Sequence, residues 1–298
     1  MLKSKIQSVR RARERSSAFG LQPLAFVCSA FTLLELLVVI SILGIIAALT
    51  VPALKNFGKS DVNISASRQL LDGVARARQL AISQRTTIYM VFVPTNFWVI
   101  PGTPNLNTAW FNLLTPAQQT AATNLCSSQL SGYNFAAYGA MGDQPGQHAW
   151  HYLAPWQVLP DGAFIAMQKF AEPSNSFYTI TDPVNNSIFY NIYGFGTNNT
   201  IPFPTETSAS GVSLPCIAFN YLGQLVSGRD EYIPLAHGSV LPAINASTKA
   251  LQIGNLTQIG NPDVLEMPPG NSTNIAYNIV HIDWLTGRAV LEFHKMGP

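Results

Sequence analysis

The chain has 298 residues, which is enough for one large domain or two small ones, and its formal net charge is +2. Charged residues make up only 11% of the chain, against about 25% in an average soluble protein. This low share indicates a membrane segment joined to a body rich in Asn, Thr, Ser, Gly and Pro, a composition typical of exported β-structure. The charges are unevenly placed along the chain. Residues 86–298 hold only five of the 17 Lys/Arg but eleven of the 15 Asp/Glu. Their net charge of −6 argues against a general nucleic-acid surface in this region.

Residues 1–30 have the composition of a cytoplasmic leader. They hold six Lys/Arg and one acid, so the positive-inside rule keeps them in the cytoplasm and sends the rest of the chain across the membrane. A secretory signal peptide would place its small residues after the apolar core. Here Ser29 and Ala30 precede the apolar run. We therefore expect the leader to be removed on the cytoplasmic side, which leaves the apolar helix on the mature protein.

Residues 31–54 form the predicted transmembrane and assembly helix. Residues 36–54 are 19 consecutive positions without a charge, close to the roughly 20 that an α-helix needs to cross a hydrocarbon core. Ser41 and Thr50 can return their hydroxyls to helix carbonyls, and Pro52 lies near the far end, where a kink is tolerated. Glu35 is the one charged residue of the stretch. A carboxylate there is costly in lipid unless it is paired, which makes it a candidate functional residue.

The ten residues from Phe31 to Ile40, FTLLELLVVI, resemble the N-terminal methylation motif of type IV pilins and type II secretion pseudopilins. The resemblance implies that a prepilin peptidase cuts between Ala30 and Phe31 and methylates the new amino terminus at Phe31. It also implies that Glu35 is the acidic fifth residue of the mature chain, with a role in assembly. One position departs from the family pattern, because Ala30 stands where the family usually has Gly.

Two interpretations of Glu35 follow from its position. After cleavage, the amine of Phe31 would be a cation one helical turn from Glu35 in the same helix, and a neighbouring subunit could supply the same cation. Either pairing would lower the cost of placing the carboxylate in the membrane. Alternatively, Glu35 marks the boundary between the hydrocarbon and the lipid headgroups.

Residues 55–85 are predicted to continue the helix as an amphipathic segment packed on a sheet. Gly58 and Gly73 are positions where this helix could bend. The apolar stripe comprises Ser67, Leu70, Leu71, Val74, Ala77 and Ala81, and the opposite side carries Arg68, Asp72, Arg76, Gln79 and Ser83. We interpret the basic side as a solvated or inter-subunit face rather than a nucleic-acid site.

Residues 86–298 are predicted to form a β-rich head. Residues 86–93 and 97–100 indicate a hairpin. Residues 101–157 are rich in Gly and Pro with little periodicity, which indicates an irregular insertion over the sheet with a short helix at 116–125. Further strands are predicted at 162–167, 187–193, 212–220, 224–226, 275–284 and 289–294, with turns at 220–223 and 285–288. This order of helix, hairpin and late turns is similar to that of GspH/FimT-type minor pseudopilins.

Few residues of the head suggest chemistry. Cys126 and Cys216 could form a disulfide if the head is exported, or could be two buried free thiols. His148 and His151 could share a metal ion, or could belong to an aromatic loop. The late strands could carry either a proton-sharing set or a solvent-facing polar strip, formed by His281, Asp283 and His294. No phosphate-binding loop, nucleophile elbow or paired-carboxylate signature occurs, so no catalytic residue, cofactor or metal is predicted.

The sequence therefore predicts an α+β, pilin-like fold with a long N-terminal helix packed on an antiparallel sheet. We expect a non-enzymatic minor pilin or pseudopilin, held in inner-membrane lipid by a single span with its head in the periplasm. The expected partners are the prepilin peptidase and other pilin subunits, and DNA is not expected to be one. Two alternatives stay open: a FimT-like minor pilin that binds DNA for uptake, and a membrane-anchored periplasmic enzyme.

Overall fold

A single long helix begins the described part of the chain. The computed structural model describes residues 32–95, 111–139, 142–143, 148–181, 188–197, 199–209, 211–242, 262–272 and 277–294, without the side chains of residues 49–61, 181, 188–189, 277 and 293–294. The helix, α1, runs over Leu33–Gln84, and the predicted leader, residues 1–30, lies outside the described residues. The chain divides into two compact units, Met1–Pro52 and Ala53–Pro298. We call the second one the head unit.

Within the head unit, α1 buries the stripe that its sequence predicts. Leu70, Val74, Ala77 and Ala81 are fully buried. The polar side that carries Arg68, Asp72, Arg76, Gln79 and Ser83 is exposed. From residue 62 onward, where the side chains are described, the prediction of an amphipathic helix packed on β-structure is therefore confirmed, and the stripe also includes Ala66.

A five-stranded sheet packs on this helix face, and every pairing in it is antiparallel. The strand order is β10-β1-β2-β3, and β4 also pairs with β2. The strands are β1 (Ile88–Phe92), β2 (Gly132–Tyr138), β3 (Trp150–Tyr152), β4 (Gln157–Val158) and β10 (Cys216–Phe219). The predicted hairpin of residues 86–93 with 97–100 is wrong, because β1 pairs with β10 on one edge and β2 on the other. Residues 97–100 themselves lie outside the described residues.

The segment 101–157 is not an irregular insertion over the sheet, because it supplies the strand beside β1. Along β2, Gly132–Ala137 are all buried. Tyr133 and Phe135 belong to the cluster that contains the α1 stripe, whereas Ala136 belongs to a second cluster on the other face. A strand that is covered on both faces shows no polar alternation, which explains why its sequence shows no period.

The short helix predicted at 116–125 is confirmed as α3, Pro116–Leu125. Thr115 caps it by accepting a hydrogen bond from the backbone N–H of Gln118, and the Gln118 side chain accepts one from the N–H of Thr115. This capping box sets where the helix begins. Leu125 and Ala122 pack into the cluster on the outer face of the first sheet, and the 3-10 turn η1, Cys126–Ser128, follows directly.

A second antiparallel sheet has the order β12-β11-β13-β14, with β5 also paired to β11. Its strands are β5 (Ala163–Ile165), β11 (Glu231–Leu241), β12 (Asp263–Glu266), β13 (Tyr277–Ile282) and β14 (Ala289–His294). The strands predicted within 162–167, 275–284 and 289–294 are confirmed. The longest strand, β11, is missed by the sequence reasoning because it contains Pro234 and Gly238, two residue types that argue against a central strand.

Smaller elements complete the head unit. The hairpin β6 (Phe177–Thr181) with β7 (Ile188–Tyr193) packs on the second sheet, where Ile180 and Ile192 join Ile279 in one buried cluster. The hairpin β8 (Thr200–Pro202) with β9 (Gly211–Ser213) and the short helix α4 (Met167–Ala171) are further elements of the described residues. The predicted strand 187–193 corresponds to β7, and 212–220 contains β10, whereas 224–226 forms only an isolated bridge between Leu225 and Phe219.

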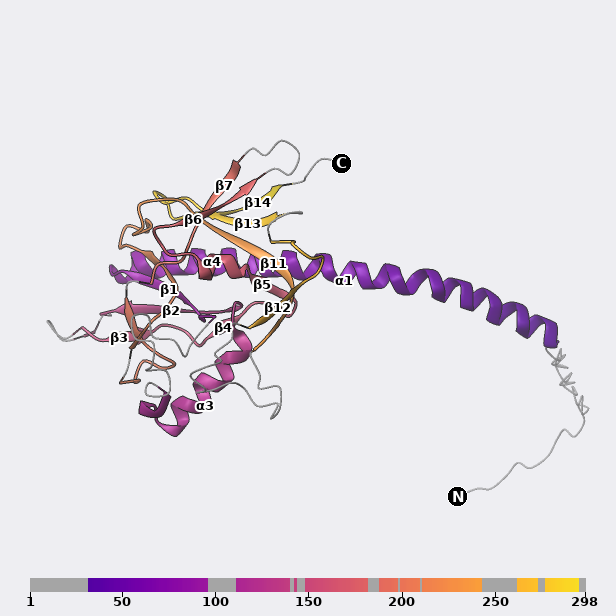
Figure 1. Ribbon diagram of the computed structural model, residues 1–298, viewed down its shortest axis with the longest axis horizontal. Helices are drawn as coiled ribbons and strands as arrows, with labels where there is room; N and C mark the ends of the chain where they lie inside the picture. The colour runs from indigo at the N-terminus through magenta and orange to yellow at the C-terminus, as the bar shows by residue number, and fades with distance from the viewer. Residues whose placement is uncertain are drawn as a thin grey trace, which may run out of the picture. The chain divides into compact units, whose positions relative to one another are not determined.

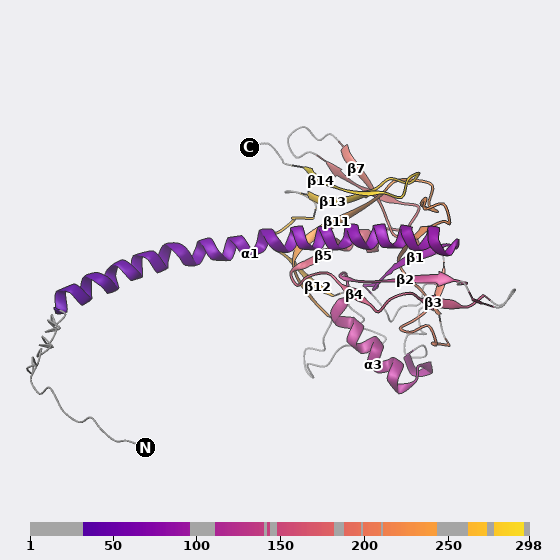
Figure 2. The same cartoon turned by 180° about the vertical axis from the view of Figure 1, so that it is seen from behind.

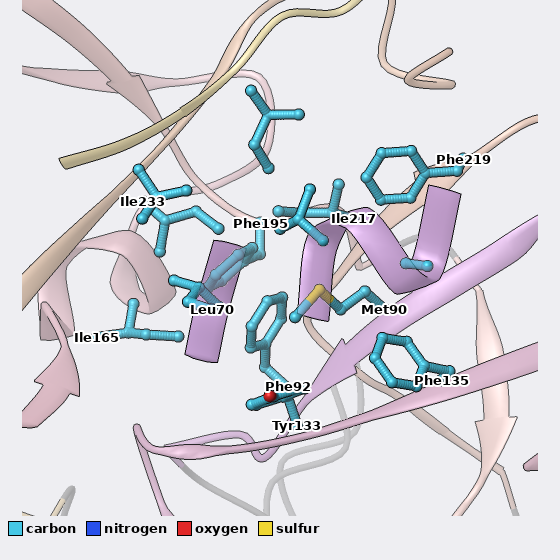
Figure 3. Close-up of a cluster of buried hydrophobic side chains, with 14 of the residues drawn as sticks. Leu70, Met90, Phe92, Tyr133, Phe135, Ile165, Phe195, Ile217, Phe219 and Ile233 are labelled. Carbon is cyan, nitrogen blue, oxygen red and sulfur yellow. The ribbon is translucent and has the colours of Figure 1, made fainter. Parts of the chain in front are cut away.

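The main core lies where α1 meets both sheets. In two opposite views, α1 runs along the boundary between them, with β1 and β2 on one side and β13 and β14 on the other (Figures 1 and 2). Side chains from all of these layers converge, among them Leu70, Phe135 and Ile233 (Figure 3). The rings of Phe92 and Phe195 stack with their centroids 4.4 Å apart. One contiguous apolar core therefore joins the helix to the two sheets.

A buried ion pair ties α4 to β11. The Nζ atom of Lys169 lies 2.7 Å from Oε2 of Glu231 and donates a second hydrogen bond of 2.6 Å to the carbonyl oxygen of Tyr193. The Lys169 side chain is fully buried and that of Glu231 nearly so. Burial lowers the pKa of Lys169, and the carboxylate of Glu231 opposes this change. Each charge is tolerated inside the head unit because the other one is present.

We predict that Lys169→Met destabilises the chain by about 3–5 kcal/mol, because it leaves the buried carboxylate of Glu231 without its nearest cation. The double variant Lys169→Met/Glu231→Leu should lose much less, because no charge then stays buried unpaired. Urea unfolding followed by tryptophan fluorescence measures both. Asp143→Asn, which breaks a more exposed ion pair with His151, is the control and should cost less than about 1 kcal/mol. Equal losses in the single and double variants would contradict this account.

Candidate functional site

The first turn of α1 is held by Thr32. The carbonyl oxygen of Thr32 accepts hydrogen bonds from the N–H groups of Glu35 and Leu36, at 3.0 and 3.1 Å. Its side-chain hydroxyl lies 3.2 Å from the same Glu35 N–H and accepts from it. Thr32 is therefore the N-cap of α1, and Glu35 occupies the third helical position, where an acid is favoured by the positive end of the helix. This role of Thr32 was not predicted, although the pattern Thr-x-x-Glu before an apolar run signals it.

Glu35 is exposed in the first turn. Among the residues that the structure describes, its carboxylate has no ion-pair partner. The predicted partner, an amine at Phe31, and the predicted cut after Ala30 fall on residues outside the described part of the chain. The pairing of Glu35 thus stays a prediction.

The side chains that follow Glu35 form an apolar surface around the whole helix. From Leu33 to Ile46, eleven large apolar side chains are 40–88% exposed, and Ser41 turns its hydroxyl back to the carbonyl of Leu37 at 2.8 Å, as predicted. A helix that is apolar on all sides is covered by something in its working state. Among the residues described with their side chains, no helix is both long and apolar enough to cross a membrane. Part of the predicted span 31–54 could not enter this search. Phe31 lies outside the described residues, and the side chains of residues 49–54, which include Thr50 and Pro52, are not described.

Cys126 and Cys216 are free and buried rather than bonded to each other. Their thiols donate to the carbonyl oxygens of Ala122 and Gly196, respectively. Burial raises the pKa of both thiols to about 12, and for Cys216 the carboxylate of Glu231 contributes. Neither is a reactive thiolate at neutral pH. The structure therefore has the second of the two arrangements that the sequence left open.

The histidines of the head unit take separate partners. His151 pairs with Asp143 at 3.0 Å, whereas the ring of His148 lies beside Tyr138. Within the described residues, no group of three or more His, Cys, Asp and Glu could hold a metal ion. The predicted set on the late strands is different in the structure. His281 contacts Asp230 and Glu292, Asp283 accepts from Thr286, and the side chain of His294 lies outside the description.

A polar cavity of about 360 Å³ lies beside the edge strand β10. Arg229, Glu231 and Cys216 line it, and the guanidinium of Arg229 stacks on the ring of Tyr193 while it donates to the carbonyl of Ser174. These groups are already engaged with one another, and the thiol in the wall is protonated at neutral pH.

Comparison with known proteins finds one matching family model, which covers a segment near the start of the chain. A family model described as the prokaryotic N-terminal methylation motif matches residues 27–51. No curated protein and no solved structure matches the chain. The matched segment contains the predicted cleavage position, Thr32 and Glu35. It supports a pilin-like protein that is processed by a prepilin peptidase and assembles with other pilins.

We predict that iodoacetamide at pH 8 labels Cys126 and Cys216 of the folded chain at least about 100-fold more slowly than a free cysteine, because a thiol of pKa about 12 is ionised to only about one part in ten thousand. Peptide mass spectrometry measures the labelling, with Ser83→Cys on the exposed side of α1 as the fast control. In urea without a reductant, both native cysteines should label fully. Cysteines that resist labelling even in urea would show a disulfide.

Proposed function

We propose that the chain is a non-enzymatic minor subunit of a type II secretion pseudopilus or a type IV pilus. Prepilin peptidase would cut between Ala30 and Phe31 and methylate Phe31, and the N-terminal helix would hold the subunit in the inner membrane with its head in the periplasm. The observation that carries the proposal is a single carboxylate, Glu35, at the start of an exposed apolar helix inside the matched motif.

The exposed apolar side chains support assembly through this helix. In water, so much apolar surface would be unfavourable, at about 25 cal/mol per Å². Lipid can cover the helix before assembly, and helices of other subunits can cover it afterwards. Val38, Val39 and Leu43 are among the exposed residues, and their shapes suit helix packing as well as lipid contact. The same surface therefore serves as anchor and as assembly interface.

The charge of Glu35 would fix the axial position of one helix relative to its neighbours. An amine at Phe31, of the same or of a neighbouring chain, would satisfy the carboxylate within an apolar bundle. A helix shifted along the filament by one turn would leave both charges unpaired in a medium of low dielectric constant. We infer that the ion pair selects the axial position at which subunits join.

We further propose that the chain is a minor subunit of the GspH/FimT type. The amphipathic helix that leads into a short strand, and the two late glycine turns, are the features similar to GspH/FimT-type minor pseudopilins. A head unit with two sheets and two additional hairpins is large, which suits a minor or terminal position better than that of a bulk subunit. No catalytic signature in the sequence suggests an enzyme.

The first test is the mature N-terminus. We predict that mass spectrometry of the chain, expressed with a prepilin peptidase, finds a terminus at Phe31 that carries one methyl group. Ala30→Gly should be processed at least as fast, because the site favours a small side chain, whereas Ala30→Trp should stay uncut. A chain that keeps Met1, or is cut beyond Ala47, would overturn the proposal.

The second test separates the charge of Glu35 from its place in the cap. Glu35→Gln keeps a favourable residue at the third helical position but removes the charge, so processing should continue while the fraction of assembled subunits falls about tenfold. Thr32→Ala removes the cap and should cost at most about 1 kcal/mol of helix stability, with a smaller loss of assembly. Sedimentation of sheared filaments measures both, with Ser41→Ala as the control.

Two outcomes of the second test would contradict the pairing. Equal losses for Glu35→Gln and Thr32→Ala would assign the effect to the helix start. Normal assembly of Glu35→Gln would leave Glu35 as a marker of the headgroup boundary.

A further inference from the structure

The outer edge of β10 forms part of the wall of the polar cavity. The N–H of Phe92 in β1 donates to the carbonyl of Pro215 at 2.8 Å, so the backbone of Pro215 is turned toward β1. These directions alternate along an antiparallel strand. The backbone groups of Cys216 and Ala218 are therefore turned away from β1, toward the outer edge of the sheet.

This outer edge is covered only in part. Cys216 exchanges two hydrogen bonds with Gly196, at 2.8 and 3.2 Å. The carbonyl of Ala218 accepts from the N–H of Val226 at 2.9 Å, but among the described residues the N–H of Ala218 has no acceptor. One backbone donor is thus left open at the edge strand, in a residue that lines the cavity.

The guanidinium of Arg229 is held in place in the same wall. Its Cζ atom lies 3.9 Å from the centroid of the Tyr193 ring, and Nη2 donates to the carbonyl of Ser174. Nε is buried, yet it has no hydrogen-bond acceptor among the described residues. Oε1 of Glu231 lies 3.8 Å from it, which is too far for a hydrogen bond. A buried donor without an acceptor costs stability, so Nε of Arg229 is the second open donor of the cavity.

The charges around the cavity leave one positive charge in excess. Two cations, Lys169 and Arg229, share the single carboxylate of Glu231, which lies 2.7 Å from Lys169. Within the described residues, Arg229 and Glu231 are the charged residues that line the cavity. Asp230 does not line it, because its carboxylate lies on the opposite side, 3.3 Å from Nε2 of His281. A monoanion would therefore balance this group of charges.

The rest of the wall offers both apolar contact and neutral polar groups. Ile217 is buried, whereas Val226 is 56% exposed although it is a large apolar residue. Hydroxyl and amide groups come from Ser174, Asn175, Asn199 and Ser227. A volume of about 360 Å³ lies at the lower end of the range of small-molecule sites. The cavity is thus large enough for an organic anion with an apolar group.

We propose that the cavity binds a carboxylate that carries an apolar group, as the C-terminal residue of a peptide does. The two oxygens of a carboxylate offer enough acceptor positions for both open donors, those of Arg229 and Ala218. Its plane also matches the edge of a guanidinium. The apolar group would contact Ile217 and Val226. Capture of a C-terminal carboxylate by backbone N–H groups is a recurring mode of peptide recognition.

This site goes beyond the proposed function, because it concerns a ligand of the head unit. Its test requires no cleavage at Phe31 and no assembly. A failure of the ligand to bind would therefore leave the pilin proposal untouched, and an uncut N-terminus would leave the carboxylate site untouched.

Binding of N-acetylleucine to the full chain in detergent micelles tests the proposal. This probe represents the C-terminal residue of a peptide, and saturation-transfer NMR detects weak binding of such a small molecule. We expect a Kd of about 1 mM. N-acetylleucinamide has the same shape without the charge and should bind at least about tenfold more weakly. Equal binding of the acid and the amide, or no binding of the acid, would overturn the proposal.

Two variants assign the binding to the cavity. Arg229→Lys keeps the charge but loses the planar fork, and it should raise the Kd of N-acetylleucine at least about tenfold. Ala218→Pro removes the open N–H at an edge strand, where proline is tolerated, and should raise the Kd about tenfold. Arg68→Lys makes the matched exchange at an exposed arginine of α1 and should leave the Kd unchanged.

Urea unfolding followed by tryptophan fluorescence shows whether each variant is folded. An unchanged Kd in either folded variant would contradict the assignment. If one variant does not fold, the other variant and the comparison of acid with amide still decide.

Three further probes test the class of ligand. N-acetylglutamic acid α-amide has its carboxylate in the side chain, acetate has no apolar group beyond a methyl, and inorganic phosphate is a different anion. Each should bind at least about tenfold more weakly than N-acetylleucine. Equal or tighter binding of the first would contradict a C-terminal residue as the ligand, of the second the apolar contact, and of the third the preference for a carboxylate.

Discussion

The head unit depends on one narrow face of α1 that touches two sheets at once. Ala66, Ala77 and Ala81 are fully buried there, beside the larger Leu70 and Val74. Small residues let the backbone of the helix come close to both sheets, and protein interiors tolerate few voids, so the approach has to be matched by larger side chains from the sheets. Phe92, Phe135 and Phe219 have this role. At Gly73 the approach is close, since a Cβ atom there would lie 3.1 Å from the ring of Tyr133.

The same helix carries a second and different surface in its first turns. Between Leu33 and Ile46 the apolar side chains are exposed on all sides, and the only charge is that of Glu35. Inside the head unit the helix is packed by its own chain, whereas this first segment offers a surface to lipid or to other helices. The two surfaces differ in what covers them, because one is buried in the head unit and the other is the exposed surface that we propose for assembly.

Local signals predict the helix well and the sheets only in part. The stripe of α1 recurs every three or four residues, and the two capping residues of α3 are three positions apart, so both features are local in the sequence. The strands β13 and β14 are also found, because apolar and β-branched residues flank a short glycine turn. In contrast, β2 looks irregular although it lies inside a sheet, because helices and strands from distant parts of the chain cover both of its faces. The Pro234 of β11 misleads for a related reason, since the tolerance of a strand for proline depends on its neighbours.

The sequence by itself determined the N-terminal features, where each signal is local: the motif, the single acid, the uncharged run and the basic leader. These residues act through their neighbours in the chain, so no long-range contact is needed to recognise them. Only the tertiary structure decided that Cys126 and Cys216 are separate buried thiols and that Lys169 faces Glu231. Those pairs are separated by 60 or more residues, and a linear pattern contains no information on which distant residues the folded core brings together.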